Sequence, residues 1–176
     1  MNISPYIDRI GDIRELLMDY FYNQLNADKT LDREYLESLK KEFDDPVIAT
    51  SEEEMITFAD DFICSYRLPD NTTILDRFVR DSSELSSTEK EIVLRWSDPV
   101  VSIFEITSVL PDGVTAENLI NEKEYTIKPT LDLPEFSECF YEGSFFYARV
   151  IPVNDTEYTF SGCQEFFPAA GKTEIY

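Results

Sequence analysis

The sequence predicts an α+β protein in which an N-terminal helical unit packs against a small antiparallel β-barrel or strongly bent sheet. Two patterns carry this prediction: apolar residues recur at three- and four-residue steps in the first half of the chain, and strand-forming residues take over after Pro99. A hydrophobic content of 43% in 176 residues is that of a globular protein. We expect about five helices over residues 1–98, about five strands over 99–165 and a C-terminal tail over 166–176.

The first two predicted helices form a hairpin. Ser4 followed by Pro5 is a helix-start signal, and the apolar stripe that follows predicts a helix over residues 5–26. A second apolar stripe runs from Tyr35 to Phe43 and must end near Asp45-Pro46, because proline disfavours helix in the residue before it. Since the connection is short, the two helices should run antiparallel.

Three shorter helices are predicted from their N-terminal capping signals, which are Ser51 with Glu54, Thr72 or Thr73, and Ser86 with Glu89. The last of them ends at Ser97-Asp98-Pro99. Trp96, the single tryptophan, lies where the last helix meets the first predicted strand. We therefore expect Trp96 to be a packing residue between the two units.

The second half of the chain has the pattern of short strands separated by turns. Pro111-Asp112-Gly113 has the residues of a hairpin turn, and a proline-containing loop is expected over residues 129–142. The predicted strands cover residues 100–110, 114–120, 124–128, 144–151 and 157–160. Five short strands at this spacing favour a small barrel or strongly bent sheet.

The charge of the chain argues against two classes of partner. There are 36 acidic and 15 basic residues, which gives a formal net charge of −21. Such a charge repels nucleic-acid phosphates and anionic membrane surfaces, and no apolar run approaches the roughly 18 residues that a membrane span requires. We expect neither direct nucleic-acid binding nor membrane association.

The cysteine and histidine content limits the chemistry further. Cys64, Cys139 and Cys163 are far apart and form no C-x-x-C pair, and the N-terminus lacks the pattern of a signal peptide. We therefore expect a cytoplasmic protein with reduced thiols. Because the chain has no histidine, zinc sites with imidazole ligands and Ser-His or Cys-His catalytic arrangements are excluded.

One stretch resembles a known group of proteins. The segments FADDFICSYRLPDNTTILDRFVRD, STEKEIVLRW and VVSIFEITSVLPDGVTAENLINEKEYTIK are similar to a unit in uncharacterised bacterial proteins, some of which carry a C-terminal SEC-C zinc motif. The resemblance covers roughly residues 52–165 and implies a helical unit followed by a small barrel. No closely spaced cysteines and no histidine follow the barrel here, so the zinc motif is absent and no cofactor is expected.

Three aspartates are the candidates for a metal site. Asp60 and Asp61 on the third predicted helix, with Asp76 on the next, would converge on a divalent cation or act as an acid and base pair in a metal-dependent hydrolase. The alternative is that adjacent aspartates point outward or cap a neighbouring helix. We favour this alternative, because the sequence has neither EF-hand spacing nor a D-x-D motif. No other catalytic or metal-binding residue is predicted.

Adjacent aromatic residues are the candidates for a binding surface. Phe145-Phe146-Tyr147 and Phe166-Phe167 place large rings on both sides of a strand, because successive side chains point to opposite faces. One side must meet the helices, a partner or solvent. Packing against the helical unit is the simpler interpretation, and Phe146, Phe166 and Phe167 are the predicted partner-binding residues.

The functional prediction is an acidic protein-interaction or adaptor module without catalytic activity, whose partner is another protein. One alternative is a DNA-mimic or inhibitor protein that uses its acidic surface. The other is the carboxylate-based metal-dependent hydrolase.

Overall fold

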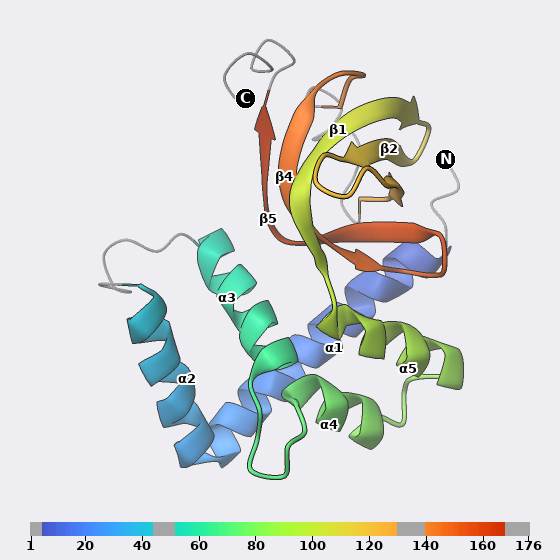
Figure 1. Ribbon diagram of the computed structural model, residues 1–176. Helices are drawn as coiled ribbons and strands as arrows, with labels where there is room; N and C mark the ends of the chain where they lie inside the picture. The colour runs from blue at the N-terminus through green and yellow to red at the C-terminus, as the bar shows by residue number, and fades with distance from the viewer. Residues whose placement is uncertain (1–4, 44–51, 130–139, 168–176) are drawn as a thin grey trace. The chain divides into compact units, whose positions relative to one another are not determined.

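The computed structural model describes residues 5–43, 52–129 and 140–167 (Figure 1). Contacts within the chain divide it into two compact units, Asp12–Ser97 and a second unit formed by Met1–Gly11 with Asp98–Tyr176. The boundary therefore falls inside the first helix, whereas the sequence assigned residues 1–98 as a whole to the helical unit. No helix among the described residues is both long and apolar enough to cross a membrane.

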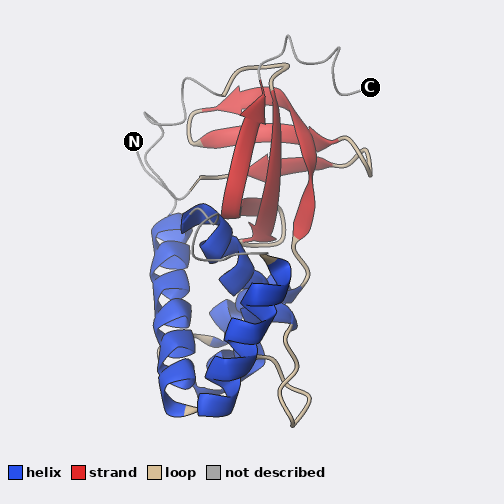
Figure 2. Cartoon of the chain, turned by 90° about the vertical axis from the view of Figure 1, so that its left-hand side faces the viewer, coloured by secondary structure: helices blue, strands red, loops and turns tan. Residues whose placement is uncertain are grey.

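The helical elements follow one another closely along the chain. They are α1 (Pro5–Ala27), α2 (Lys29–Glu42), α3 (Glu52–Ser65), α4 (Ile74–Asp81), α5 (Ser87–Leu94) and the 3-10 turn η1 (Arg95–Ser97). α1 and α2 run in opposite directions, as predicted (Figure 2). The single residue between them, Asp28, caps α2 by accepting hydrogen bonds from the backbone amides of Thr30 and Leu31.

Aromatic rings form much of the core of the helical unit. Phe21 of α1 is completely buried, and its ring centroid lies 5.2 Å from that of Tyr35 on α2. Tyr35 in turn lies 5.1 Å from Phe62 on α3. Both contacts are edge-to-face, the arrangement that the ring quadrupoles favour.

Two of the predicted helix caps are confirmed, and both are capping boxes. The side chain of Thr73 accepts from the Asp76 amide while the Asp76 carboxylate accepts from the Thr73 amide, so Thr73 rather than Thr72 begins α4. Ser86 and Glu89 make the same reciprocal pair at the start of α5. The predicted cap at Ser51 lies outside the described residues.

The strands close into a ring. They are β1 (Val100–Leu110), β2 (Gly113–Asn118), β3 (Glu124–Ile127), β4 (Phe145–Pro152) and β5 (Glu157–Phe167), and their order around the barrel is β1-β2-β3-β5-β4. The predicted α+β class and the barrel are thus confirmed. Of the pairings in the ring, β3 with β5 is parallel and the others are antiparallel. Because β3 pairs with β5 rather than with β4, the strands do not follow one another around the ring in sequence order.

The barrel has an apolar interior. Phe104 of β1 and Phe146 of β4 stack with centroids 5.1 Å apart, and Phe160 of β5 meets Phe146 edge-on at 5.6 Å. The interior side chains come from every strand of the ring; they are Phe104, Ile106, Val114, Ala116, Tyr125, Ile127, Phe140, Phe146, Ala148, Val150 and Phe160. Inward residues alternate with outward ones on β1 and β2, as the pleat requires.

Strand β5 is longer than predicted and bends sharply (Figure 1). The sequence predicted a strand over residues 157–160, but β5 continues through Gly162, whose φ of 80° is one that glycine adopts without strain. The pairing register with β4 shifts at this point. Such a bulge bends a strand and allows a sheet to close. Phe166 and Phe167 therefore belong to β5 and not to a separate tail.

A buried lysine ties one end of the barrel together. The ammonium group of Lys128, which follows β3, pairs with Asp112 in the β1–β2 turn. It also lies 3.7 Å from Glu157 at the start of β5. Because Lys128 is only 7% exposed, these two carboxylates compensate a charge that would otherwise be costly to bury.

Candidate functional site

The three candidate metal ligands have separate structural roles. Asp60 is buried and forms an ion pair with Arg14, which joins α3 to α1 at 3.0 Å. Asp61 is exposed. Asp76 is engaged in the capping box of α4, with Arg67 3.9 Å away. Asp61 thus lies as the outward-pointing alternative describes, whereas Asp60 is buried in an ion pair and Asp76 caps its own helix.

The described residues hold no group of three or more Asp, Glu, Cys or His side chains placed to bind a metal ion. Cys64, of intermediate exposure on α3, is not part of such a group. The carboxylate-based hydrolase therefore has no assembled metal centre within the part of the chain that the structure describes.

The predicted aromatic residues fall into different environments. Phe146 is completely buried inside the barrel, so it contributes to the core and offers no surface to a partner. Phe166 points toward the same interior, where its ring lies 5.5 Å from Phe140 and 5.8 Å from Phe146. Phe167 faces the outside of β5 and is partly exposed. The pleat explains the difference, because successive residues of a strand point to opposite faces and closure makes one of these faces the barrel interior.

An apolar patch covers the outer wall of three adjacent strands. On β1 and β4, Ile103 pairs directly with Tyr147, and Val101 lies two residues along from Ile103 on the same face. Phe167 of β5 faces the same side. Val101 is 47% exposed and Tyr147 is 44% exposed. We call Val101, Ile103, Tyr147 and Phe167 the outer-wall patch.

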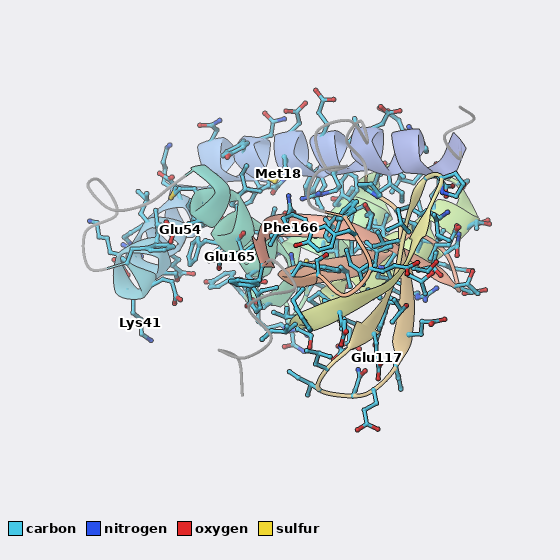
Figure 3. The ribbon with its side chains drawn as sticks, turned by 90° about the horizontal axis from the view of Figure 1, so that it is seen from above. Met18, Lys41, Glu54, Glu117, Glu165 and Phe166 are labelled. Atoms are coloured by element: carbon cyan, nitrogen blue, oxygen red, sulfur yellow. The ribbon has the colours of Figure 1, made fainter. Side chains whose placement is uncertain are left out.

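Carboxylates border the outer-wall patch on both sides. Glu105 follows Ile103 on the outer face of β1, and Glu165 of β5 pairs directly with Tyr147. Figure 3 labels Glu165 together with Phe166, the inward-facing residue that follows it. The result is an apolar centre with an acidic rim, a composition suited to a partner with apolar and basic side chains.

Glutamates also form a row across the barrel. Glu105 pairs with Glu117 of β2, and Glu117 pairs with Glu124 of β3. Like charges directly opposite each other destabilise a sheet, so the two glutamate pairs in this row work against the strand pairing.

The helical unit contains a cavity of about 300 Å³ between α1, α4 and the residues after α4. Leu16 and Phe78 supply apolar surface, and Asp19 and Glu84 supply carboxylates. The full lining consists of Leu16, Asp19, Tyr20, Asn23, Phe78, Asp81, Ser82, Ser83 and Glu84. On α1, residues 16, 19, 20 and 23 share one helix face.

Tyr20 and Asp81 form the polar centre of this cavity. The Tyr20 hydroxyl donates to Asp81 Oδ2 at 2.8 Å, while Arg80 donates from Nε to Asp81 Oδ1 at 2.8 Å. Burial, followed by the hydrogen bond to Asp81 and the Asp81 charge, raises the pKa of Tyr20 to about 12. Arg80 first and then Tyr20 lower the pKa of Asp81. At neutral pH the phenol is therefore neutral and the carboxylate charged.

Sequence reasoning missed both surfaces. Tyr20 and Asp81 are 61 positions apart, and no local spacing connects them. The outer-wall patch depends on the β1–β4 pairing, which brings Ile103 beside Tyr147 across 44 positions. A local signal existed only for Phe167, because paired phenylalanines in a strand must occupy opposite faces.

Comparison with known proteins identifies a family. No curated protein and no solved structure matches the chain. A family model, described as "Family of unknown function (DUF7986)", matches residues 7–176, which include both the helical elements and the barrel. The chain therefore belongs to this family of unknown function, DUF7986.

Proposed function

We propose that this protein is a non-catalytic interaction module whose outer-wall patch binds another protein with an apolar centre and basic flanks. The observation that carries the proposal is the exposed Tyr147, paired with Ile103 and flanked by Val101 and Phe167. Tyrosine is among the residue types that dominate binding energy at protein interfaces. We further propose that the protein is cytoplasmic and that it is related to bacterial proteins, some of which carry a SEC-C motif.

The geometry of the barrel supports recognition by side chains. Strand β4, at the centre of the patch, pairs with β1 on one side and with β5 on the other, so it offers no unpaired edge to which a partner strand would add. A partner would instead pack its own side chains on the wall. Strands hold Val101, Ile103 and Tyr147 in a fixed register, which lowers the entropic cost of binding.

Charge supports a basic partner. The rim carboxylates Glu105 and Glu165 flank the patch, and the whole chain carries −21. A long-range negative field accelerates association with a cationic surface, and added salt screens the field and weakens this acceleration. The association rate with the partner should therefore fall with ionic strength.

Site-specific photo-cross-linking tests the proposal. Tyr147 is replaced by the photoreactive amino acid benzoylphenylalanine, and the matched control carries it at Tyr141, which is exposed to a similar extent (41%) outside the patch. We expect one protein to be cross-linked from position 147 and not from position 141. Identical cross-linking patterns from the two positions would contradict a specific interface on the outer wall.

The glutamate row favours a second candidate function, a DNA mimic. Adjacent strands space Glu105, Glu117 and Glu124 by about 4.8 Å, compared with one phosphate per roughly 3.4 Å of helix axis on each strand of DNA. The DNA mimic predicts that the protein displaces duplex DNA from a basic DNA-binding protein. Glu117→Gln should weaken that displacement more than the control Glu122→Gln does, and equal effects would remove this candidate.

A further inference from the structure

The cavity between α1 and α4 is independent of the outer-wall patch, which lies on the barrel. Its volume of about 300 Å³ is at the lower end of the range for ligand pockets, roughly 300–1,000 Å³. A small molecule or a single side chain fits such a space.

The residues that line the cavity supply both apolar and acidic surface. The rings of Tyr20 and Phe78 lie 5.6 Å apart in an edge-to-face arrangement, and Leu16 adds aliphatic surface. Asp19, Asp81 and Glu84 contribute carboxylates. Asp81 is paired with Arg80, which lies outside the lining, so the carboxylates of the site still outnumber its cations. An aromatic and aliphatic lining with an excess of carboxylates is the environment that a cation on an aliphatic stem requires.

We propose that this cavity binds an organic cation, an alkylguanidinium or alkylammonium group on a short aliphatic stem. Leu16 and Phe78 contact the stem, and the carboxylate of Asp19 neutralises the charge. The Tyr20 hydroxyl donates a hydrogen bond to Asp81, so the hydroxyl oxygen can accept a hydrogen bond from the ligand N–H.

The hydrogen bonds between Tyr20, Asp81 and Arg80 support this assignment. Because Asp81 holds both the Tyr20 hydroxyl and the Arg80 guanidinium, its position is set before a ligand enters. A phenol with a raised pKa stays neutral at physiological pH and retains its acceptor lone pairs. A ligand amine therefore meets a prearranged group rather than one that must reorganise.

Nuclear magnetic resonance titration of the ¹⁵N-labelled full chain tests the proposal with three probes. Butylguanidinium and butylammonium carry the proposed charge, and butylurea is a neutral analogue of nearly the same shape. We expect both cations to shift the Asn23 side-chain amide and the Ser83 backbone amide with a dissociation constant of about 1–10 mM, as small ligands allow. Butylurea should bind at least about tenfold more weakly.

Matched variants locate the charge that is recognised. Asp19→Asn should weaken butylguanidinium binding about tenfold, whereas Glu15→Gln, the same charge change four residues away on α1, should alter it less than twofold. Glu84→Gln is the second cavity variant. An unchanged spectrum outside the cavity verifies that each variant is folded.

Three results would overturn the proposal: no shifts with either cation at 50 mM, equal binding of butylurea, or equal losses from Asp19→Asn and Glu15→Gln. The source of the cation is resolved by a fourth probe, the amide of N-acetylarginine. Tighter binding of this probe than of butylguanidinium supports a protein side chain as ligand, and weaker binding supports a free amine. The cross-linking result at Tyr147 is unaffected by either outcome.

Discussion

At the scale of single residues, two glycines have opposite consequences for stability. Gly113, at the start of β2, lies so close to β3 that an added Cβ would be 2.2 Å from the backbone oxygen of Ile127. Since a backbone atom cannot move aside cheaply, Gly113→Ala should lower the free energy of unfolding by about 3 kcal/mol. Urea unfolding measures this, and a loss below about 0.5 kcal/mol would contradict the close approach.

Gly11, inside α1, provides the contrasting case. A Cβ at this position meets no atom within 4 Å outside its own helix. Gly11→Ala should therefore raise the free energy of unfolding by about 1 kcal/mol, the difference in helix propensity between the two residues. The same urea experiment checks this prediction, and a destabilised variant would show that the helix is not regular at Gly11.

Asp70, in the loop before α4, gives a residue-scale prediction about pH. The Thr72 hydroxyl and amide donate to Asp70 Oδ1 at 2.6 and 3.1 Å, and Arg77 donates to Oδ2 at 3.0 Å. These bonds, those from Thr72 first, lower the pKa of Asp70 to about 2. A lowered pKa stabilises the fold above the ordinary carboxyl pKa of about 3.9, and this stabilisation is lost as the pH falls from there through 2.

The experiment follows the Asp70 carboxyl carbon by nuclear magnetic resonance as pH is lowered. We expect a midpoint near 2 in the natural protein and a higher midpoint in Thr72→Val, which lacks the hydroxyl donor. Because Asp70 is exposed, the effect on overall stability is small. A midpoint near 4 in the natural protein would show that the loop hydrogen bonds do not persist in solution.

At the scale of elements, Trp96 anchors the end of the helical unit. It lies on η1, is 3% exposed, and η1 contacts α5 and α3 within the same unit. Trp96→Ala should lower the free energy of unfolding by about 3–5 kcal/mol, as for other buried aromatic truncations. Thermal unfolding monitored by circular dichroism checks this. A negligible change would mean that the indole is not part of the core.

Local signals accounted for the elements that depend on neighbours in sequence. The helix caps at Thr73 and Ser86 could be predicted because all their atoms lie within four residues. The extension of β5 could not be predicted, because Gly162 resembles a strand end although it forms a bulge. The sequence pattern therefore predicted the existence of β5 better than its length.

At the scale of the whole molecule, pairing between distant strands was beyond sequence reasoning. Alternation predicted that β3 and β5 exist, but not that they pair in parallel, because that pairing depends on closing the entire ring. The same limit applied to function. Phe146 looked like a surface candidate until closure placed it inside the barrel, and Tyr147 became exposed for the same reason.

The central claim is that the outer-wall patch binds a protein, and two matched substitutions on β1 test it most directly. Val101 lies in the patch and Val109 lies outside it, on the same strand and with nearly the same exposure, 47% and 45%. The measurement is the dissociation constant of the partner cross-linked from position 147. We predict that Val101→Ser raises it about tenfold and Val109→Ser less than twofold. Equal effects of the two substitutions would contradict the claim.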